Sequence, residues 1–418
     1  MTSEQAVHIY SGKLYEWQRA SAKVLAKFKN DLIYTILSPR QVGKTHFLEM
    51  YTLSRCINSR NQRVVIVNPT FSNSKRTYND FAKWLQQMPP EIVTSANASD
   101  LQIKFANNST IQLKSIEQGN GLRGDHCNTL IIDEAAFIPT TDAMSLLFPY
   151  VNATRGNIIL ISTPTFKDEC NLFFKFWQLA HTAGKANIKY ADWSKYDTSA
   201  VLTPEKKELL KQTMPHNIYC NEILGEFLTE KSDLWDISPI LKNGTLPTAK
   251  MFGGLDWGAS GTDSTVLSVF NENRQMYRLI RLDHNTPPTE QIKIILATVK
   301  ELHINTVVYE SNSIGFPLAD FLKTEAARQR IQCRFVAFNT SNESKRNIVE
   351  QMQILIQNQQ VSLLDDMQLK LQFTHFEMKS TPSGKITYGN SSDTIHDDIV
   401  IATALALTAD SRGSYAVK

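Results

Sequence analysis

The feature that most constrains this chain is a short loop sequence near its N-terminus. It runs from Ser38 to Thr45, includes Gly43 and Lys44, and follows the apolar run Leu32–Leu37. A loop that binds a triphosphate needs converging backbone N–H groups, a lysine that reaches the β- and γ-phosphates, and a hydroxyl for Mg²⁺. An apolar strand, this loop and a following helix therefore predict a nucleotide-binding site.

The individual loop positions have distinct expected roles. Gly43 lets the backbone approach the nucleotide, Lys44 is the cation, and Thr45 is the magnesium ligand. The first glycine of the usual motif is replaced by Ser38, which weakens the motif when it is read alone. The other positions expected to contact the nucleotide are Arg40, Gln41 and Val42.

An acidic pair follows a second apolar run. Asp133 comes directly after Leu130–Ile132 and is expected to hold Mg²⁺, directly or through water. Glu134 is placed to polarise the attacking water as a general base. An Asp-Glu pair can also simply end a strand in solvent, but its occurrence after a phosphate loop favours an ATPase.

Residues on either side of these motifs are candidates for contacts with ATP. Gln18, beside Tyr15 and Trp17, is predicted to hydrogen-bond adenine while an aromatic ring stacks on it; an ordinary amphipathic helix is the alternative. Ser162 and Thr163 end another apolar run, where a polar group could sense the γ-phosphate and relay hydrolysis to movement.

Two arginines are candidates for the residue that stabilises charge in the transition state. Arg40 lies inside the loop and would act on its own nucleotide, whereas Arg123 would act on the nucleotide of a neighbouring copy. Lone arginines are more often surface residues, and position in the chain favours Arg40.

Four carboxylates in the second half form a different pattern. Asp256 and Glu310 each end an apolar run, whereas Asp397 and Asp398 begin an apolar, helix-like segment. Converging carboxylates can hold two Mg²⁺ or Mn²⁺ ions about 4 Å apart around a scissile phosphate, and hard oxygen ligands suit those ions. Each acid alone also fits a structural role, and an acidic pair suits the dipole of a helix N-terminus. As a set, the four predict a two-metal nuclease.

Three basic residues of the second half are candidates for contacts with DNA phosphates. They are Arg346, Lys379 and Lys385, of which Lys385 is expected in a turn between two strands. Because isolated basic side chains are normally solvated, a plain surface position is the alternative interpretation.

The order of apolar and amphipathic segments predicts two α/β domains. In the first half, continuous apolar runs alternate with helix-like stretches, which indicates a parallel sheet covered on both faces, as in RecA-type phosphate-loop ATPases. The strands expected there are Leu32–Leu37, Val64–Val67, Thr129–Ile132 and Asn157–Ser162, with Leu101–Phe105 and Thr110–Lys114 as an antiparallel hairpin.

The second half has a different order of segments. Three strand-like runs precede alternating helices and strands, an order that resembles RNase H-like domains. The three runs are Met251–Asp256, Thr265–Phe270 and Met276–Leu282. Polar, proline-interrupted sequence before them places the ATPase domain at 1–185, a junction at 186–250 and the nuclease domain at 251–418.

Composition limits the binding surface and the cellular setting. A net charge of +3 leaves any DNA-binding surface to a local patch. The five cysteines show no metal-binding spacing, which favours buried reduced thiols in a cytosolic protein. No apolar run approaches the ~18 residues of a membrane-spanning helix and no signal sequence opens the chain, so we expect neither export nor membrane insertion.

The motifs together resemble those of the large terminase subunits of tailed phages. The variant loop Pro39–Thr45, with Arg-Gln and no leading glycine, is familiar in that family. The likeness extends to Asp133-Glu134, Ser162-Thr163-Pro164, Cys220–Phe227 and His396-Asp397-Asp398, and it runs from about residue 12 to 408.

This resemblance implies a motor that uses ATP to translocate double-stranded viral DNA into a procapsid, and a nuclease that cuts concatemeric DNA. It implies ATP with Mg²⁺ in the first domain and two Mg²⁺ or Mn²⁺ ions in the second. The implied partners are the portal protein, a small terminase subunit and four further copies in a docked ring of five, with a monomer in solution left open. The expected location is the host-cell cytoplasm.

Two other functions fit parts of the sequence. A helicase-nuclease of DNA repair would need a second RecA-like domain, which the second half does not offer. A non-catalytic DNA-binding scaffold at a capsid vertex would leave all the acids with structural roles.

Overall fold

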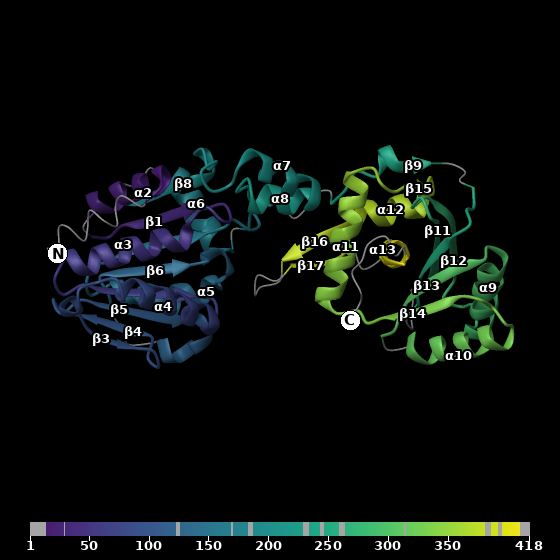
Figure 1. Ribbon diagram of the computed structural model, residues 1–418, viewed down its shortest axis with the longest axis horizontal. Coiled ribbons are helices and arrows are strands. Elements are labelled where there is room, and N and C mark those ends of the chain that lie inside the picture. The colour runs from purple at the N-terminus through teal and green to yellow at the C-terminus, as the bar shows by residue number, and fades with distance from the viewer. Residues whose placement is uncertain are drawn as a thin grey trace. The chain divides into compact units, whose positions relative to one another are not determined.

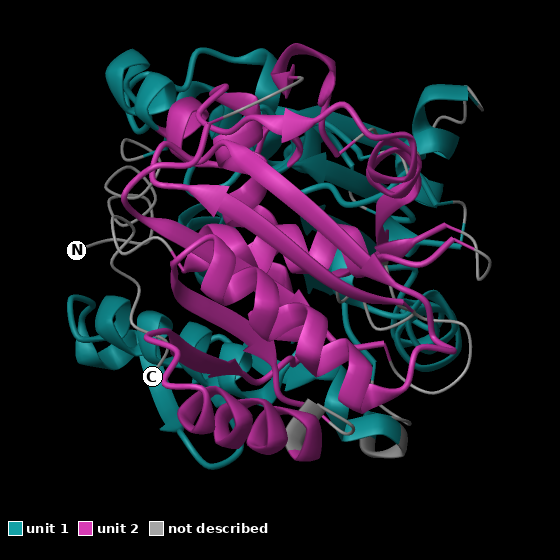
Figure 2. Cartoon of the chain, turned by 90° about the vertical axis from the view of Figure 1, so that its right-hand side faces the viewer, with its two compact units in different colours: residues 1–209, 218–229, 380–385 teal, residues 210–217, 230–379, 386–418 magenta. Residues whose placement is uncertain are grey.

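The computed structural model divides the chain into two compact units (Figures 1 and 2). It describes residues 14–28, 30–122, 126–168, 170–182, 187–228, 234–242, 246–258, 264–312, 315–380, 386–391 and 395–409. The first unit contains residues 1–209, 218–229 and 380–385, and the second contains 210–217, 230–379 and 386–418. Two helices contain residues of both units, α7 (Pro204–Thr213) and α8 (His216–Glu222).

The first unit is built on an eight-stranded sheet. Its strands lie in the order β3 (Val93–Asn97), β4 (Gln102–Phe105), β5 (Thr110–Ser115), β2 (Arg63–Asn68), β6 (Thr129–Asp133), β7 (Asn157–Ser162), β1 (Ile33–Leu37) and β8 (Ile188–Asp192). The six strands from β5 to β8 run parallel, and β3 and β4 are added antiparallel at one edge. This confirms the predicted parallel sheet and the predicted hairpin, which is formed by β4 and β5, whereas β3 was not predicted. The edge strand β8 extends the sheet past residue 185, where the sequence places the end of the ATPase domain.

Helices cover both faces of this sheet (Figure 1). The helices of the unit are α2 (Glu16–Lys27), α3 (Lys44–Asn58), α4 (Phe71–Leu85), the single turn α5 (Thr140–Asp142) and α6 (Leu172–Thr182). Successive strand residues point to opposite faces, so Ile131 joins the core under α2, α3 and α4, whereas Ile132 joins the core under α6. Burial on both faces explains why the parallel strands are continuously apolar.

The second unit is built on a five-stranded mixed sheet. Its strands lie in the order β12 (Met276–Leu282), β11 (Thr265–Asn271), β10 (Met251–Asp256), β13 (Ile304–Glu310) and β14 (Arg334–Phe338). The first three pair antiparallel, as the predicted meander requires, and β10, β13 and β14 pair parallel. The carboxyl ends of β10 and β13 therefore lie next to each other. A RecA-like second domain is not what this unit forms.

One face of this second sheet packs against α9 (Pro288–Glu301) and α10 (Gly315–Arg328), and α13 (Asp398–Thr408) packs against β10 and β11. Gly254 of β10 makes the α13 contact possible. A Cβ at this position would lie 2.1 Å from the carbonyl oxygen of Ala402 and 2.2 Å from the backbone nitrogen of Ala406. The close approach fixes the start of α13 beside the end of β10.

The remaining elements of the second unit are two further helices and two pairs of strands. They are α11 (Asn342–Gln357), α12 (Met367–His375), the paired strands β9 (Leu241–Lys242) and β15 (Leu363–Leu364), and the paired strands β16 (Phe376–Ser380) and β17 (Ile386–Asn390). Within the described residues, no helix has the length and apolarity of a membrane span.

The five cysteines are free, but their burial differs from the prediction. Cys56 and Cys127 are buried as expected. Cys170 is exposed, and Cys220 and Cys333 are partly exposed. Spacing in the sequence excludes a paired framework, but it does not show which thiols the helices and strands cover.

Candidate functional sites

The phosphate-loop sequence lies between β1 and α3, as predicted. Ser38 follows β1, and α3 begins at Lys44. The loop needs left-handed backbone at Gly43, with φ +86°, and at Gln41, with φ +64°. A pocket of about 450 Å³ opens beside it, with room for a phosphate chain. The pocket is lined by Pro39, Arg40, Gln41, Gly43, Lys44, Thr45, His46, Glu134, Phe137, Thr163, Asn221 and Glu222.

Gln18 supports this loop from behind and is fully buried. Its Nε2 donates to the Gly43 carbonyl oxygen at 2.8 Å, and its Oε1 accepts from the Tyr15 backbone N–H at 2.9 Å. Trp17 adds a second brace, because its Nε1 donates to the Val42 carbonyl oxygen at 3.1 Å. The rings of Tyr15 and Trp17 stack on each other. Both ends of the Gln18 amide are thus engaged within the chain, and the adenine contact stays a prediction.

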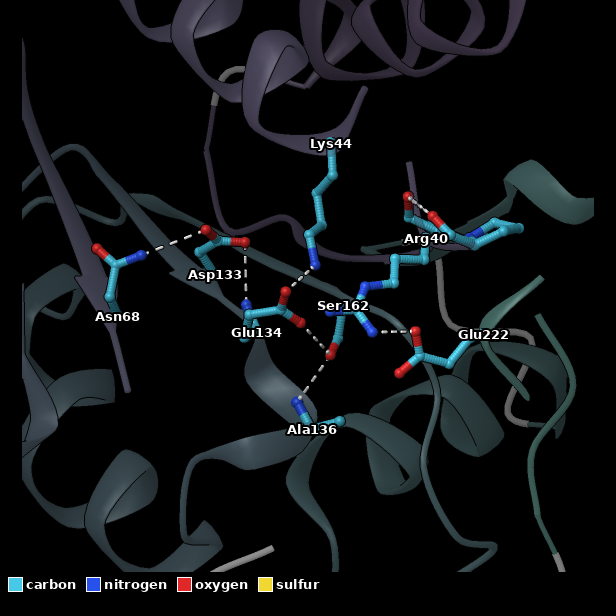
Figure 3. Close-up of polar contacts among 10 residues, drawn as sticks. Arg40, Lys44, Asn68, Asp133, Glu134, Ala136, Ser162 and Glu222 are labelled. Carbon is cyan, nitrogen blue, oxygen red and sulfur yellow. Dashed lines mark hydrogen bonds and ion pairs between the residues drawn. The ribbon is translucent and has the colours of Figure 1, made fainter. Parts of the chain in front are cut away.

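The predicted Lys44 and Glu134 meet at the pocket, and Asp133 lies beside Glu134 (Figure 3). Lys44 Nζ lies 2.5 Å from Glu134 Oε1. Ser162 Oγ donates to the other carboxylate oxygen of Glu134 at 3.4 Å, and accepts from the Ala136 backbone N–H at 3.2 Å. Glu134 itself has a left-handed backbone, with φ +52°, an unusual conformation for a glutamate that turns its side chain from the end of β6.

Asp133 ends β6 and is buried. Burial raises its pKa to about 6, and the Lys44 ammonium opposes this shift while the Glu134 carboxylate adds to it. Asn68 Nδ2 donates to Asp133 Oδ2 at 3.2 Å, and the Glu134 backbone N–H donates to Oδ1 at 3.0 Å. The Asp133 carboxylate and the Thr45 hydroxyl are oxygen donors that suit Mg²⁺, and the nearby Lys44 ammonium suits the phosphates of a triphosphate.

Sequence reasoning missed Asn68, which ends β2 beside the strand of Asp133. Its Oδ1 lies 3.3 Å from Ser74 Oγ, whose single hydroxyl proton has the Lys114 carbonyl oxygen at 2.7 Å as its nearer acceptor. The available signal was a polar residue at the end of an apolar run, before Pro69.

The remaining predicted residues of this unit have distinct places. Arg40, an exposed side chain at the rim of the pocket, forms an ion pair with Glu222 (Figure 3). Ser38 is buried, and its backbone N–H donates to the Ser162 carbonyl oxygen at 3.0 Å. Thr163 lines the pocket. Arg123 lies outside the described residues, so its predicted role has no geometry here.

Asn221 was missed as an individual residue, although it lies in the Cys220–Phe227 segment. Its Nδ2 donates to the carbonyl oxygens of Pro164 and Glu226, both at 2.9 Å. The neighbouring Glu222 carbonyl oxygen accepts from the Arg40 backbone N–H at 2.7 Å. This short segment therefore holds both the loop and the end of β7 in place.

The four predicted acids of the second unit gather at one end of its sheet. Asp256 and Glu310 end the adjacent parallel strands β10 and β13, and Asp397 and Asp398 stand at the start of α13, which packs on β10. Burial raises the pKa of Asp256 well above its ordinary value. A hydrogen bond with Glu310 and the negative charges of Glu310, Asp398 and Asp397 raise it further. The negative charges of these acids are therefore not fully balanced by nearby positive groups or hydrogen-bond donors.

Two of these acids already have other partners. Asp397 Oδ2 lies 2.7 Å from Lys345 Nζ, and Asp398 Oδ2 accepts from the Ser264 backbone N–H at 3.0 Å. Among the residues that the structure describes, no three acidic, histidine or cysteine side chains already form a ligand set for one ion. Oxygen donors with an excess of negative charge nevertheless fit Mg²⁺ or Mn²⁺.

Two amide side chains that sequence reasoning missed hold the start of α13. Gln372 of α12 accepts from the Ile399 backbone N–H at 2.8 Å and so satisfies one of the free N–H groups at this helix end. Asn390 Nδ2 donates to the Ile395 carbonyl oxygen at 2.8 Å, and also to that of His396. Neither residue has a local sequence signal, because each acts on a segment that is distant or irregular.

The residues predicted to contact DNA phosphates are engaged within the chain. Arg346 Nε lies 2.6 Å from Glu350 Oε1, and Lys379 Nζ donates to the Asn390 carbonyl oxygen at 2.8 Å. Lys385 lies outside the described residues. The phosphate contacts stay predictions.

Comparisons with known proteins agree with these two sites. The family model described as "Terminase large subunit, T4likevirus-type, N-terminal" matches residues 35–242. The model described as "Terminase RNaseH-like domain" matches residues 253–409. Together they span both units and all four acids of the second.

Individual relatives are distant. The large terminase subunit of Thermus phage G20c is 22% identical over 321 residues, which cover 70% of this chain and 64% of that protein, less than two thirds of its length. The solved large terminase of a thermophilic bacteriophage has a TM-score of 0.57 at 12% identity and covers 94% of this chain and 98% of its own. The same phage protein in complex with ATP-γ-S has a TM-score of 0.54, with the same identity and coverage. At this identity the structural likeness shows the shared fold.

Proposed function

Because this chain belongs to the family of large terminase subunits, we propose that it drives viral double-stranded DNA into a procapsid and cuts it. The first unit would hydrolyse ATP to translocate the DNA. The second would be a metal-dependent endonuclease that cleaves concatemeric DNA. The observation that carries this proposal is the presence in one chain of a lysine–glutamate pair at a phosphate loop and a separate, buried cluster of carboxylates.

The ATPase step follows from the residues around the pocket. Lys44 would leave Glu134 to bind the β- and γ-phosphates, which would free the Glu134 carboxylate to orient and deprotonate the attacking water. Thr45 and Asp133 would hold Mg²⁺, which neutralises phosphate charge. The solved complex of the thermophilic phage terminase with ATP-γ-S supports a nucleotide at this fold.

Changes in this pocket have a direct route to neighbouring elements. Ser162, at the end of β7, contacts Glu134. Two residues further on, the Pro164 carbonyl oxygen accepts a hydrogen bond from Asn221 of α8. Movement of the Glu134 carboxylate toward the water would therefore change the contact at the end of β7, and through Pro164 and Asn221 it would reach α8. Arg40, once released from Glu222, would stabilise charge on the transferred phosphate.

The nuclease step would use the acidic end of the second sheet. Asp256, Glu310, Asp397 and Asp398 would hold two Mg²⁺ or Mn²⁺ ions, which activate water and stabilise charge on a scissile phosphate. Burial of Asp256 among other acids makes the cluster a strong acceptor of positive charge. Gln372 would keep the start of α13, and hence Asp398, beside the strand ends.

We place the ATPase function in the first unit, whose sheet extends past residue 185 to β8, and the nuclease function at 251–418. The proposed partners are double-stranded DNA, the portal protein and a small terminase subunit, in the host-cell cytoplasm. Five copies would form the docked ring. Family membership supports these assignments.

The proposal is tested by separating the two activities. Lys44→Ala is expected to lower ATP hydrolysis by roughly 10²–10³-fold, the usual cost of removing a group that stabilises transition-state charge, and to leave Mn²⁺-dependent plasmid cleavage intact. Asp256→Ala is expected to abolish cleavage and leave ATP hydrolysis intact. Unchanged cleavage in the Asp256 variant would remove the nuclease assignment, and unchanged hydrolysis in the Lys44 variant would remove the motor assignment.

A further inference from the structure

We propose that Lys345 is a built-in cation of the acidic cluster, which competes with divalent metal ions for Asp397 and so raises the metal concentration that the site requires. The inference rests on the proposed nuclease function and identifies a positioning residue that acts through Asp397.

Lys345 lies near the N-terminus of α11, where the helix itself does not stabilise a positive charge. Ser341 caps α11, because its Oγ accepts from the Ser344 backbone N–H at 3.1 Å. Lys345 therefore lies in the first turn, where the helix dipole disfavours a positive charge. The contact that the structure shows for this side chain is with Asp397, a carboxylate at the start of another helix.

That contact is well formed. Lys345 Nζ lies 2.7 Å from Asp397 Oδ2 and 5.9 Å from the centre of the Phe376 ring. The side chains of Lys345 and Asp397 are only 22% and 28% exposed. A partly buried ion pair is less screened by solvent than a surface pair, so it opposes removal of either partner.

The two neighbouring acids at the start of α13 are held differently. Asp398 accepts from a neutral backbone N–H of Ser264, a bond that can persist when the carboxylate also binds a cation. Asp397 instead pairs with a full positive charge. A metal ion at Asp397 therefore has to displace or repel the Lys345 ammonium, whereas the contact from Ser264 to Asp398 brings no full charge.

This arrangement has a functional consequence. The ammonium offsets the negative charge of Asp397, which is one of the acids near Asp256, and so stabilises the cluster before a metal binds. The same charge weakens metal binding at Asp397. Removing it is expected to tighten metal binding, which is the opposite of what structural damage to the site would do.

The test is Mn²⁺ binding to the full-length protein, followed by electron paramagnetic resonance of the free ion. Asp256→Asn defines the binding that belongs to the cluster. Relative to wild type, Lys345→Met is expected to tighten this binding by about three- to tenfold, which corresponds to a partly exposed ion pair of about 1 kcal/mol. Lys345→Arg, which keeps the charge, is expected to retain wild-type affinity.

Lys293→Met is the matched control. Lys293 also pairs with an acid, Glu290 of the same helix, at 3.1 Å on the surface of the second unit, and its loss is expected to leave Mn²⁺ affinity unchanged. Circular dichroism and ATP hydrolysis verify that each variant is folded. If the methionine variant does not fold, Lys345→Gln provides the same neutral test.

The outcomes distinguish failure of the proposed nuclease site from failure of the proposed role of Lys345 alone. Absence of any Mn²⁺ binding that Asp256→Asn removes would overturn the proposed nuclease site and this inference with it. Binding that depends on Asp256 but is unchanged or weakened in a folded, neutral Lys345 variant would overturn the role of Lys345 alone. Tighter binding in the neutral variant, with arginine restoring wild-type affinity, would establish it.

Discussion

The two candidate sites balance charge in opposite ways. At the nucleotide pocket, Glu134 has Lys44 at 2.5 Å and a serine hydroxyl on its other oxygen, while Asn68 holds Asp133. At the end of the second sheet, four acids gather and Lys345 pairs with one of them. The acids of the first site thus have a lysine, a hydroxyl and an amide as partners, whereas the second site gathers several acids around Asp256.

This difference fits the ligands that the proposed function assigns to each site. A triphosphate brings negative charge, so its pocket needs a lysine that can be released from an internal carboxylate. A two-metal site receives positive charge, so a surplus of carboxylates is stabilised when the ions bind. A substitution at one site is expected to change the activity of that site alone, so the activity of the other site serves as an internal control.

The largest expected effect is at Glu134. Glu134→Gln removes the proposed base and is expected to lower the ATP turnover number by about 10²–10⁴-fold. Because Lys44 loses its internal partner, ATP binding is expected to stay equal or become tighter. Steady-state hydrolysis and a nucleotide titration measure the two effects, with DNA cleavage as the control. Normal turnover would show that another group activates the water.

The second effect is at the contact between β10 and α13. A methyl group in Gly254→Ala would meet helix backbone at 2.1–2.2 Å, so α13 must shift and carry Asp398 with it. We expect a loss of about 1–3 kcal/mol in unfolding free energy and weaker DNA cleavage at normal ATP hydrolysis. Gly389→Ala is the matched control, since nothing lies within 4 Å of the added atom. Equal effects of the two substitutions would contradict the packing argument.

The third effect is at Asn68, which holds Asp133. Asn68→Ala removes one hydrogen bond to a buried carboxylate, a contact of about 1.5–3 kcal/mol when one partner is charged. ATP turnover is expected to fall by roughly tenfold, with a higher Mg²⁺ requirement. Activity measured across a Mg²⁺ series at saturating ATP tests this, and an unchanged Mg²⁺ dependence would show that Asp133 is positioned without Asn68.

The smallest expected effect is a pH dependence at Glu49, a buried residue of α3 whose Oε2 accepts from Trp84 Nε1 at 2.9 Å. Burial raises its pKa from 4.5 to about 7. A carboxyl group with a raised folded-state pKa favours folding below its unfolded pKa, and this contribution is lost as pH rises through the folded value. The neutral Glu49→Gln variant is therefore expected to melt about 2–4 °C above wild type at pH 8, with the difference shrinking toward pH 4.5. A difference that does not change with pH would contradict this assignment.

Local patterns in the sequence predicted much of both sites. The loop from Ser38 to Thr45 and the Asp133-Glu134 pair are contiguous, so their chemistry is visible before the fold is known. Asp256 and Glu310 were predictable because each ends an apolar run, and the ends of neighbouring parallel strands meet. The roles of all these residues remain proposals, although their convergence is observed.

Long-range packing explains what the sequence did not reveal. Gln18 contacts the loop 25 residues away, so its burial behind Gly43 depends on how α2 packs. Lys345 and Asp397 are 52 residues apart, and Asn68 and Asp133 are 65 apart. None of these pairs has a spacing that periodicity can detect. The need for a glycine at position 254 is likewise visible only in the folded protein, where the backbone of α13 lies against it.

The most direct test of the central claim is anomalous diffraction from crystals of the full-length protein soaked in Mn²⁺. The account predicts density for Mn²⁺ among the carboxylates of Asp256, Glu310, Asp397 and Asp398, with the Lys345 ammonium moved away from Asp397. Bound Mn²⁺ elsewhere, with these four side chains unchanged and without anomalous density between them, would contradict it.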